Sequence, residues 1–272
     1  MHTFAYHRPT TTKQAAALLA KKETKALAGG QTLIPALKLR LASTENLVDL
    51  GGIKGLNDIA VKGKTLVIGA LARHAAVASS SVVKKAIPAL AKLAESIGDP
   101  HVRNAGTIGG SLANNDPSAD YPAAVLALDA TIVTNKRKIA ADKFFKGLFE
   151  TALGKGEFIL QVVFPLPKRA AYQKFPHPAS RFALVGVFVA DHGKDMRVAV
   201  TGAAEDGVFR AKDMEAALKK KFASASLDAI KVPAKGIMSD IHADAAYRAH
   251  LVGVMARRAV ASAIEHGGDG ED

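Results

Sequence analysis

The chain has 272 residues, of which 49% are apolar and 23% are charged, a composition typical of a folded globular protein with one large domain or two of ordinary size. It contains no cysteine, which excludes a thiolate-bound iron–sulfur cluster, a thiolate zinc site and a disulfide within this chain. A formal net charge of +12 invites a nucleic-acid interpretation, but the clusters of Lys and Arg are short and no aromatic residues alternate with them, which favours a solvated basic face.

Residues 1–52 are predicted to form a compact α/β unit. Its predicted elements are an edge strand at 4–8, a helix at 14–22, a strand at 25–28, a helix at 35–41 and a strand at 46–50. The second strand runs directly into Gly29 and Gly30. No G-x-G-x-x-G pattern occurs in the chain, so nicotinamide binding of the usual Rossmann kind is disfavoured.

A second unit is predicted from residue 53 to a soft domain boundary near residue 176. Its predicted elements are a hairpin turn at 62–64 before a strand at 65–69, helices at 75–80, 81–98 and 121–128, a strand at 130–134, a helix at 143–149 and a strand at 158–164. The breaker Pro165-Leu166-Pro167 precedes the boundary.

The third region is predicted to be a small α+β domain that packs on the first two units. Its predicted elements are strands at 180–190, 196–202 and 207–210 and helices at 212–220 and 243–265. We expect disorder in the glycine-rich tail at 267–270. No stretch has the roughly 20 apolar residues of a membrane span, and the first residues lack the pattern of a signal peptide, so a cytoplasmic protein is expected.

The stretch from Gly98 to Asp129 is the most informative part of the sequence. Gly106, Gly109 and Gly110 predict a loop whose backbone can reach positive φ and approach a ligand closely. Polar residues and a helix starting at Tyr121 follow, and free N–H groups at a helix start attract anions. This pattern favours a ligand rich in phosphate oxygens.

A similar stretch occurs earlier, at Ala28-Gly29-Gly30-Gln31-Thr32-Leu33. Together with Thr107-Ile108-Gly109-Gly110-Ser111 it resembles the two FAD-binding signatures of the medium subunit of molybdenum hydroxylases, the family of xanthine dehydrogenase and aerobic carbon monoxide dehydrogenase. The resemblance extends through 28–50, 103–129 and 245–252, and so covers essentially the whole chain.

The resemblance implies a fold. It is an α+β protein with a two-lobed FAD-binding domain of the vanillyl-alcohol oxidase (PCMH) type at 1–176, with lobes at about 1–52 and 53–176. A C-terminal domain of the carbon monoxide dehydrogenase flavoprotein type follows at 177–272.

The resemblance also implies the residues that bind FAD. The two glycine segments, defined as Ala28, Gly29, Gly30, Gln31, Thr32 and Leu33 and as Thr107, Ile108, Gly109, Gly110 and Ser111, would cradle the pyrophosphate. Asp120 would accept hydrogen bonds from the adenosine ribose, and capping the helix at Tyr121 is its alternative role.

Four further residues match cofactor positions of the family. Gly98 would approach FAD through its backbone, Leu160 and Lys174 would line the cofactor, and Phe182 would lie against the isoalloxazine. A C-cap, a core leucine and a surface lysine are the structural alternatives for the first three. Relatives often read Asp-aromatic-Ala where this chain reads Arg181-Phe182-Ala183, so the contact with the flavin face stays open.

The resemblance implies electron transfer rather than substrate chemistry, with no catalytic residue and no metal site in this chain. A large subunit with a molybdenum cofactor would oxidise the substrate, and a small [2Fe–2S] subunit would pass electrons to FAD, in a heterotrimer or its dimer. The substrate and the final acceptor stay open. The alternatives are a self-sufficient FAD-dependent oxidoreductase of the same fold, or a basic binding module without cofactor.

Overall fold

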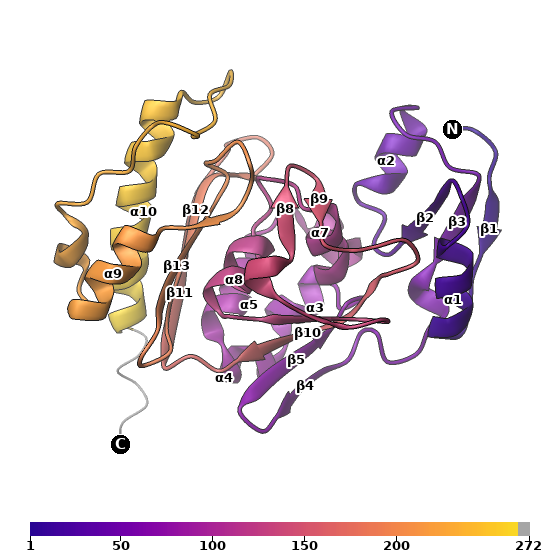
Figure 1. Cartoon of the computed structure of the whole chain (residues 1–272), viewed down its shortest axis with the longest axis horizontal. Coiled ribbons are helices and arrows are strands. Elements are labelled where there is room, and N and C mark those ends of the chain that lie inside the picture. Colours follow the sequence, from indigo (N-terminus) through magenta and orange to yellow (C-terminus); the bar gives the residue numbers. More distant parts are fainter. Residues whose placement is uncertain (266–272) are drawn as a thin grey trace.

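The computed structural model of the protein describes residues 1–265. They form three parts that follow one another along the long axis of the molecule: an N-terminal part (1–52), a central part (53–165) and a C-terminal part (169–265) (Figure 1). The mixture of helices and strands confirms the predicted α+β class. The disorder predicted at 267–270 concerns positions outside the described residues.

The N-terminal part is a small parallel sheet of order β1-β3-β2 with two helices. Its elements are β1 (Ala5–His7), α1 (Thr12–Leu19), β2 (Thr24–Leu27), α2 (Leu33–Lys38), β3 (Asn46–Asp49) and the 3₁₀ turn η1 (Leu50–Gly52). Helix α1 begins two residues before the predicted start, because the Thr11 hydroxyl accepts a hydrogen bond from the Gln14 N–H and so caps the helix at Thr11. The order of strand, glycine turn, helix and strand is therefore confirmed.

The central part is a five-stranded antiparallel sheet of order β4-β5-β10-β6-β7 with a layer of helices. The strands are β4 (Ile59–Lys62), β5 (Thr65–Gly69), β6 (Thr131–Thr134), β7 (Lys138–Ala140) and β10 (Ile159–Pro165). The helices are α3 (His74–Ser79), α4 (Ser81–Ala86), α5 (Pro88–Glu95), α6 (Pro100–Ala105), α7 (Ile108–Asn114) and α8 (Tyr121–Ala127). The predicted hairpin at 62–64 and the helix after Asp120 are both confirmed.

Two of the predicted helices in the central part are wrong. The helix predicted at 81–98 is divided into α4 and α5, because Pro88 cannot donate to the preceding turn and instead starts a new helix. The stretch at 143–149, predicted as a helix, is not helical beyond Lys143, the last residue of the 3₁₀ turn η2 (Ala141–Lys143). The residues that follow form β8 (Phe145–Gly147), which pairs with β9 (Glu150–Thr151) in a hairpin. Phe149 has φ of 55° there, which a helix does not allow.

The C-terminal part is a four-stranded antiparallel sheet of order β11-β12-β13-β14, covered on one face by two helices (Figure 1). Its elements are β11 (Arg169–Pro176), β12 (Ala183–Asp191), β13 (Met196–Thr201), β14 (Phe209–Arg210), α9 (Lys212–Lys220), η3 (Ser224–Leu227) and α10 (Ala245–Glu265). In β12, Val187 and Val189 pack in one apolar cluster with α10, and Phe188 and Ala190 join the core of the central part. Every residue of β12 is buried, since the sheet has a protein layer on each face.

Strand β11 was absent from the predicted elements. It pairs with β12 from Arg169 to Pro176 and so belongs to the C-terminal sheet, whereas the expected boundary near residue 176 lies at its far end. Sheet pairing changes at the proline-containing connection after Pro165. We therefore propose to place the domain boundary at this connection.

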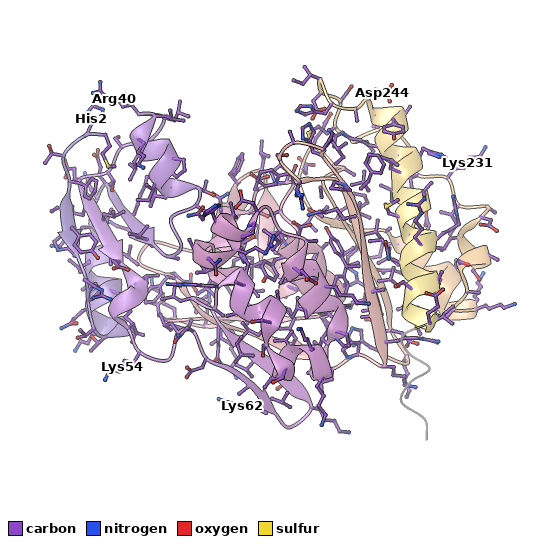
Figure 2. The ribbon with its side chains drawn as sticks, turned by 180° about the vertical axis from the view of Figure 1, so that it is seen from behind. His2, Arg40, Lys54, Lys62, Lys231 and Asp244 are labelled. Carbon is purple, nitrogen blue, oxygen red and sulfur yellow. The ribbon has the colours of Figure 1, made fainter. Side chains whose placement is uncertain are left out.

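At both ends of its long axis, the molecule extends toward the same side. Arg40, in the loop after α2, and Asp244, directly before α10, both lie at that side (Figure 2). No helix among residues 1–265 is both long and apolar enough to cross a membrane.

Candidate functional site

The first glycine segment packs against the start of the second and against the two residues that directly precede it, Ala105 and Gly106. A Cβ placed on Gly29 would lie 2.2 Å from the carbonyl oxygen of Ala105 and 2.7 Å from the Cα of Gly106, and one placed on Gly110 would lie 3.7 Å from the Cβ of Ala28. The approach at Gly29 is closer than any side chain permits. The fold therefore brings together two glycine segments that are far apart in the sequence. The close approach requires glycine at position 29.

The first glycine segment presents a row of free hydrogen-bond donors. It follows β2, turns at Gly30 with φ of 71° and leads into α2. The backbone N–H groups of Gly29, Gly30, Gln31 and Thr32 donate to no acceptor among residues 1–265, and the Thr32 hydroxyl makes no capping bond. Successive N–H groups of this kind form a concavity that suits an anion.

The second glycine segment is the start of a helix and not the predicted loop. Thr107 caps α7 by accepting from the Gly110 N–H at 3.1 Å, and the N–H groups of Ile108 and Gly109 donate to the carbonyls of Ala72 and Ala70. Its first donors are thus used within the chain. The glycines of this stretch do not have positive φ, so the expectation of left-handed backbone was wrong.

These glycines instead allow close packing. A Cβ on Gly109 would lie 2.6 Å from the Cβ of Ala70, and one on Gly106 would lie 2.6 Å from Nε2 of His74. Ser111 follows in the first turn of α7. The second segment is thus tightly packed and forms a wall beside the first segment.

Asp120 is buried at the start of α8 and is held from β11. Its Oδ1 accepts hydrogen bonds from the Tyr172 hydroxyl at 2.5 Å and from Nζ of Lys174 at 3.0 Å. Burial raises the pKa of Asp120, while Lys174 and Tyr172 oppose the shift. Asp120 occupies the N-cap position of α8, as its predicted alternative role requires, but its side chain makes no capping bond to the helix.

Gly98 lies in a turn whose carbonyls are held by two cations. Nζ of Lys174 donates to the Ser96 carbonyl at 2.9 Å, and Nη1 of Arg103 donates to the carbonyls of Ile97 and Gly98 at 2.9 Å and 3.2 Å. Gly98 has φ of 44°, directly beyond the end of α5. Both cations lie at the C-terminal end of α5, where the helix dipole favours positive charge.

His74 and Tyr121 form a buried pair behind the second segment. Their ring centroids are 5.3 Å apart, and neither Nδ1 of His74 nor the Tyr121 hydroxyl has a hydrogen-bond partner among residues 1–265. Burial, and secondarily the charge of Arg103, lowers the pKa of His74 to about 4. The imidazole is therefore neutral at pH 7.

Almost the whole chain matches two models of known protein families. A family model described as the FAD binding domain in molybdopterin dehydrogenase matches residues 2–167, and a model described as the CO dehydrogenase flavoprotein C-terminal domain matches residues 170–263. The chain belongs to this family of FAD-binding subunits. It is thus an oxidoreductase subunit, and its cofactor is FAD.

Individual members of the family match along almost their whole length. The carbon monoxide dehydrogenase medium chain of Hydrogenophaga pseudoflava is 34% identical over 96% of each chain. The nicotine 6-hydroxylase medium subunit of Paenarthrobacter nicotinovorans is 34% identical, over 95% of this chain and 96% of its own. The solved quinoline 2-oxidoreductase of Pseudomonas putida 86 superposes with a TM-score of 0.87 at 27% identity, over 98% of each chain.

The residues present suit the FAD of this family. The N–H groups of Gly29 to Thr32 donate to no acceptor within residues 1–265, so they can donate to the oxygens of a pyrophosphate. Asp120 keeps Oδ2 for a ligand because both of its bonds from β11 end on Oδ1. A cleft of about 660 Å³ adjoins the contact; Ala28, Gly29 and Thr107 are the predicted site residues that line it, and Asp120 is not part of its lining.

Leu160 and Phe182 lie apart from this cluster. The carbonyl of Leu160, in β10, accepts a hydrogen bond from the Ala70 N–H, and the carbonyl of Ala70 accepts one from the Gly109 N–H. Leu160 is therefore linked to the second glycine segment through Ala70. Phe182 lies in the connection between β11 and β12 with 51% of its surface exposed. The cofactor contacts predicted for Leu160 and Phe182 stay predictions.

The sequence reasoning missed three residues of the site region: His74, Arg103 and Tyr172. Arg103 opens a stretch that resembles the family, which was a usable signal. His74 and Tyr172 carry no motif, because their positions follow only from how α3 and β11 pack.

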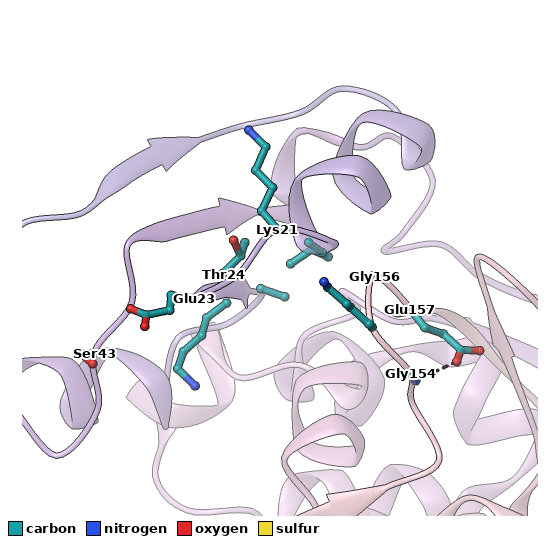
Figure 3. Close-up of a pocket in the computed structure, with 11 residues that line it drawn as sticks. Lys21, Glu23, Thr24, Ser43, Gly154, Gly156 and Glu157 are labelled. Atoms are coloured by element: carbon teal, nitrogen blue, oxygen red, sulfur yellow. Dashed lines mark hydrogen bonds between the residues drawn. The ribbon is translucent and has the colours of Figure 1, made fainter.

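A second cleft lies away from these residues. It has a volume of about 620 Å³ and is lined by the end of α1, by β2 and by the loop at 154–157 (Figure 3). Lys21, Glu23, Thr24 and Glu157 are among its lining residues, and none of the predicted site residues is.

Proposed function

We propose that this protein is the medium subunit of a three-subunit molybdenum hydroxylase and transfers electrons without acting on the substrate. A small partner subunit with [2Fe–2S] clusters would deliver electrons to this chain, after a large subunit with a molybdenum cofactor has oxidised the substrate. The observation that carries the proposal is the contact between the two glycine segments, with unused N–H donors on the first. The chain contains no cysteine, so clusters must come from a partner.

We assign the cofactor contacts as follows. The N–H groups from Gly29 to Thr32 bind the pyrophosphate against the wall of Thr107 to Ser111, and Asp120 accepts from the ribose hydroxyls. Gly98, Leu160 and Phe182 border the cofactor, and Lys174 lies beside it, paired with Asp120. Bound FAD supplies the redox chemistry, and this chain orients it and sets its electrostatic surroundings.

Several finer points belong to the same proposal. The enzyme is carbon monoxide dehydrogenase-like, assembles as a heterotrimer or its dimer and is cytoplasmic. The N-terminal and central parts are the two lobes of a PCMH-type domain. Similarity to a medium chain of carbon monoxide dehydrogenase supports the first point.

We expect FAD to be bound without a covalent link, because no His or Cys occupies a motif for such a link. Acid denaturation of the purified protein should release about one FAD per chain into the supernatant. Flavin that stays with the precipitated protein would exclude a non-covalent link, and a colourless protein that cannot be reconstituted would exclude the whole assignment.

The electron-transfer proposal is tested by assaying the isolated FAD-loaded chain with carbon monoxide, purines and aldehydes and an artificial electron acceptor. We expect turnover only after the molybdenum and iron–sulfur subunits are added. Turnover by the isolated chain would favour the self-sufficient oxidoreductase.

A further inference from the structure

Asp120 is held by two residues from a different part of the protein. Tyr172 and Lys174 are two positions apart on β11 and so project from the same face of that strand. Both donate to Oδ1 of Asp120, at 2.5 Å and 3.0 Å. The C-terminal sheet therefore fixes a carboxylate that belongs to the central part.

The position of Tyr172 depends on a glycine in the neighbouring strand. Gly186, in β12, pairs with Lys174, and a Cβ placed on Gly186 would lie 2.3 Å from the Tyr172 hydroxyl oxygen. The Tyr172 ring stacks on Phe188 with centroids 6.0 Å apart. The hydroxyl thus occupies space that any other residue at 186 would fill.

The ion pair of Asp120 with Lys174 is almost out of water, with 5% and 7% of the side chains exposed. Removing two charges from water costs about as much as their attraction returns, so such a pair is weak evidence for a role in stability. Lys174 is further fixed by the Ser96 carbonyl at 2.9 Å. The arrangement holds one oxygen of Asp120 in place and leaves the other for a ligand.

We propose that Lys174 and Tyr172 are positioning residues, which keep Asp120 charged and aim its Oδ2 at the vicinal hydroxyls of the ribose in the adenosine half of FAD. This inference rests on the proposed function, in which Asp120 contacts that ribose. It assigns Lys174 an indirect role through Asp120 in place of the predicted direct one. The C-terminal domain then takes part in selecting the dinucleotide.

The charges around Asp120 make the role testable by pH. Tyr172 and Lys174 face it from β11, Tyr121 follows it in α8, and His74 contacts Tyr121 from α3. Burial raises the pKa of both phenols and lowers the pKa of His74 to about 4. Without Lys174, Asp120 is the group whose titration moves toward neutral pH.

The test is the affinity of the flavin-free, full-length chain for FAD, with ADP and FMN as competing probes of its two halves. In Lys174→Met we expect FAD and ADP to bind roughly tenfold or more weakly near pH 7, because a charged acceptor is lost. FMN binding should change by less than about twofold. Tyr172→Phe should act in the same direction with a smaller effect, and Lys174→Arg should restore most of the affinity.

The pH profile distinguishes positioning from a loss of structure. As pH falls, Lys174→Met should lose FAD affinity at a higher pH than the wild type does, because Lys174 opposes the rise in the pKa of Asp120 that burial causes. Lys168→Met, an exposed lysine just before β11, is the matched control and should match the wild type. If Lys174→Met does not fold, Tyr172→Phe and Lys174→Arg carry the test.

Two outcomes separate the inference from the function on which it rests. If Asp120→Asn weakens FAD but Lys174→Met and Tyr172→Phe do not, the positioning role is wrong and the ribose contact stands. If Asp120→Asn itself leaves FAD affinity unchanged, the ribose contact is wrong. Equal loss of FMN and ADP binding in Lys174→Met would show a general structural effect and overturn the inference.

Discussion

Gly29 is the residue at which the first glycine segment most closely approaches the backbone that leads into the second. Gly29→Ala would bring its Cβ to 2.2 Å from the Ala105 carbonyl oxygen, so the segments must separate. We expect a loss of about 1 to 3 kcal/mol in the free energy of unfolding and a loss of most bound FAD. Flavin content and urea unfolding measure both effects.

Gly147 provides the control for this substitution. A Cβ there meets nothing within 4 Å, and its φ is not positive. Gly147→Ala should therefore keep full FAD occupancy and wild-type stability. Full occupancy in Gly29→Ala as well would show that the contact is not needed for cofactor binding.

His74 should make the stability of the protein depend on pH. Burial lowers its pKa to about 4 in the folded state, below the ordinary value of about 6.5 in the unfolded chain. The unfolded state therefore binds more protons between these values, so stability is complete above about pH 6.5 and is lost as pH falls toward about 4, by roughly 3 kcal/mol at most. His74→Leu should flatten this part of a urea-unfolding pH series, and an unchanged slope would contradict the assignment.

At the level of secondary-structure elements, the contact between α7 and the β8–β9 hairpin depends on Asn115. It ends α7 with φ of 46°, and its Nδ2 donates to the carbonyls of Gly147 and Glu150 at 2.7 Å and 2.9 Å. Asn115→Ala removes both bonds and strains the backbone, so we expect a loss of about 2 to 4 kcal/mol in unfolding free energy. Asn115→Gly relieves the strain and should be about 1 kcal/mol more stable than Asn115→Ala by urea unfolding. Equal stability of the two variants would exclude backbone strain as a cause.

The elements also show where prediction from the sequence stops. Helix α9 has the predicted bounds because its apolar spacing and its charged ends agree with a helix. The stretch at 143–149 has a pattern that suits helix and strand equally, and the bond of Asn115 to Gly147 from far along the chain decides for a hairpin. The second glycine segment was misread as a loop because the cap by Thr107 starts α7 inside it.

The same limit applies to the candidate site. The glycine segments were identified from motifs, since close backbone approach requires glycine, and Asp120 was identified from the resemblance to the family. Tyr172 was missed because its role depends on a contact from β11 that no local pattern encodes, whereas Arg103 lies in a stretch that resembles the family.

For the whole molecule, the central and C-terminal parts share one core. Phe188, Ala190 and Ala199 of the C-terminal sheet belong to the apolar cluster that also contains Leu90 and Tyr121. We therefore expect one cooperative unfolding transition for the two parts, measured by urea with circular dichroism and tyrosine fluorescence. Transitions at different urea concentrations for the two probes would show that the parts unfold independently.

The central claim is that this chain carries FAD as an electron-transfer subunit, and anaerobic reduction of its flavin tests that claim most directly. The FAD-loaded chain is mixed with substrate and with the molybdenum and iron–sulfur subunits, each omitted in turn, and the visible flavin absorbance is followed. We predict rapid bleaching only when both partners are present. Bleaching by substrate in the absence of the iron–sulfur subunit would contradict the account.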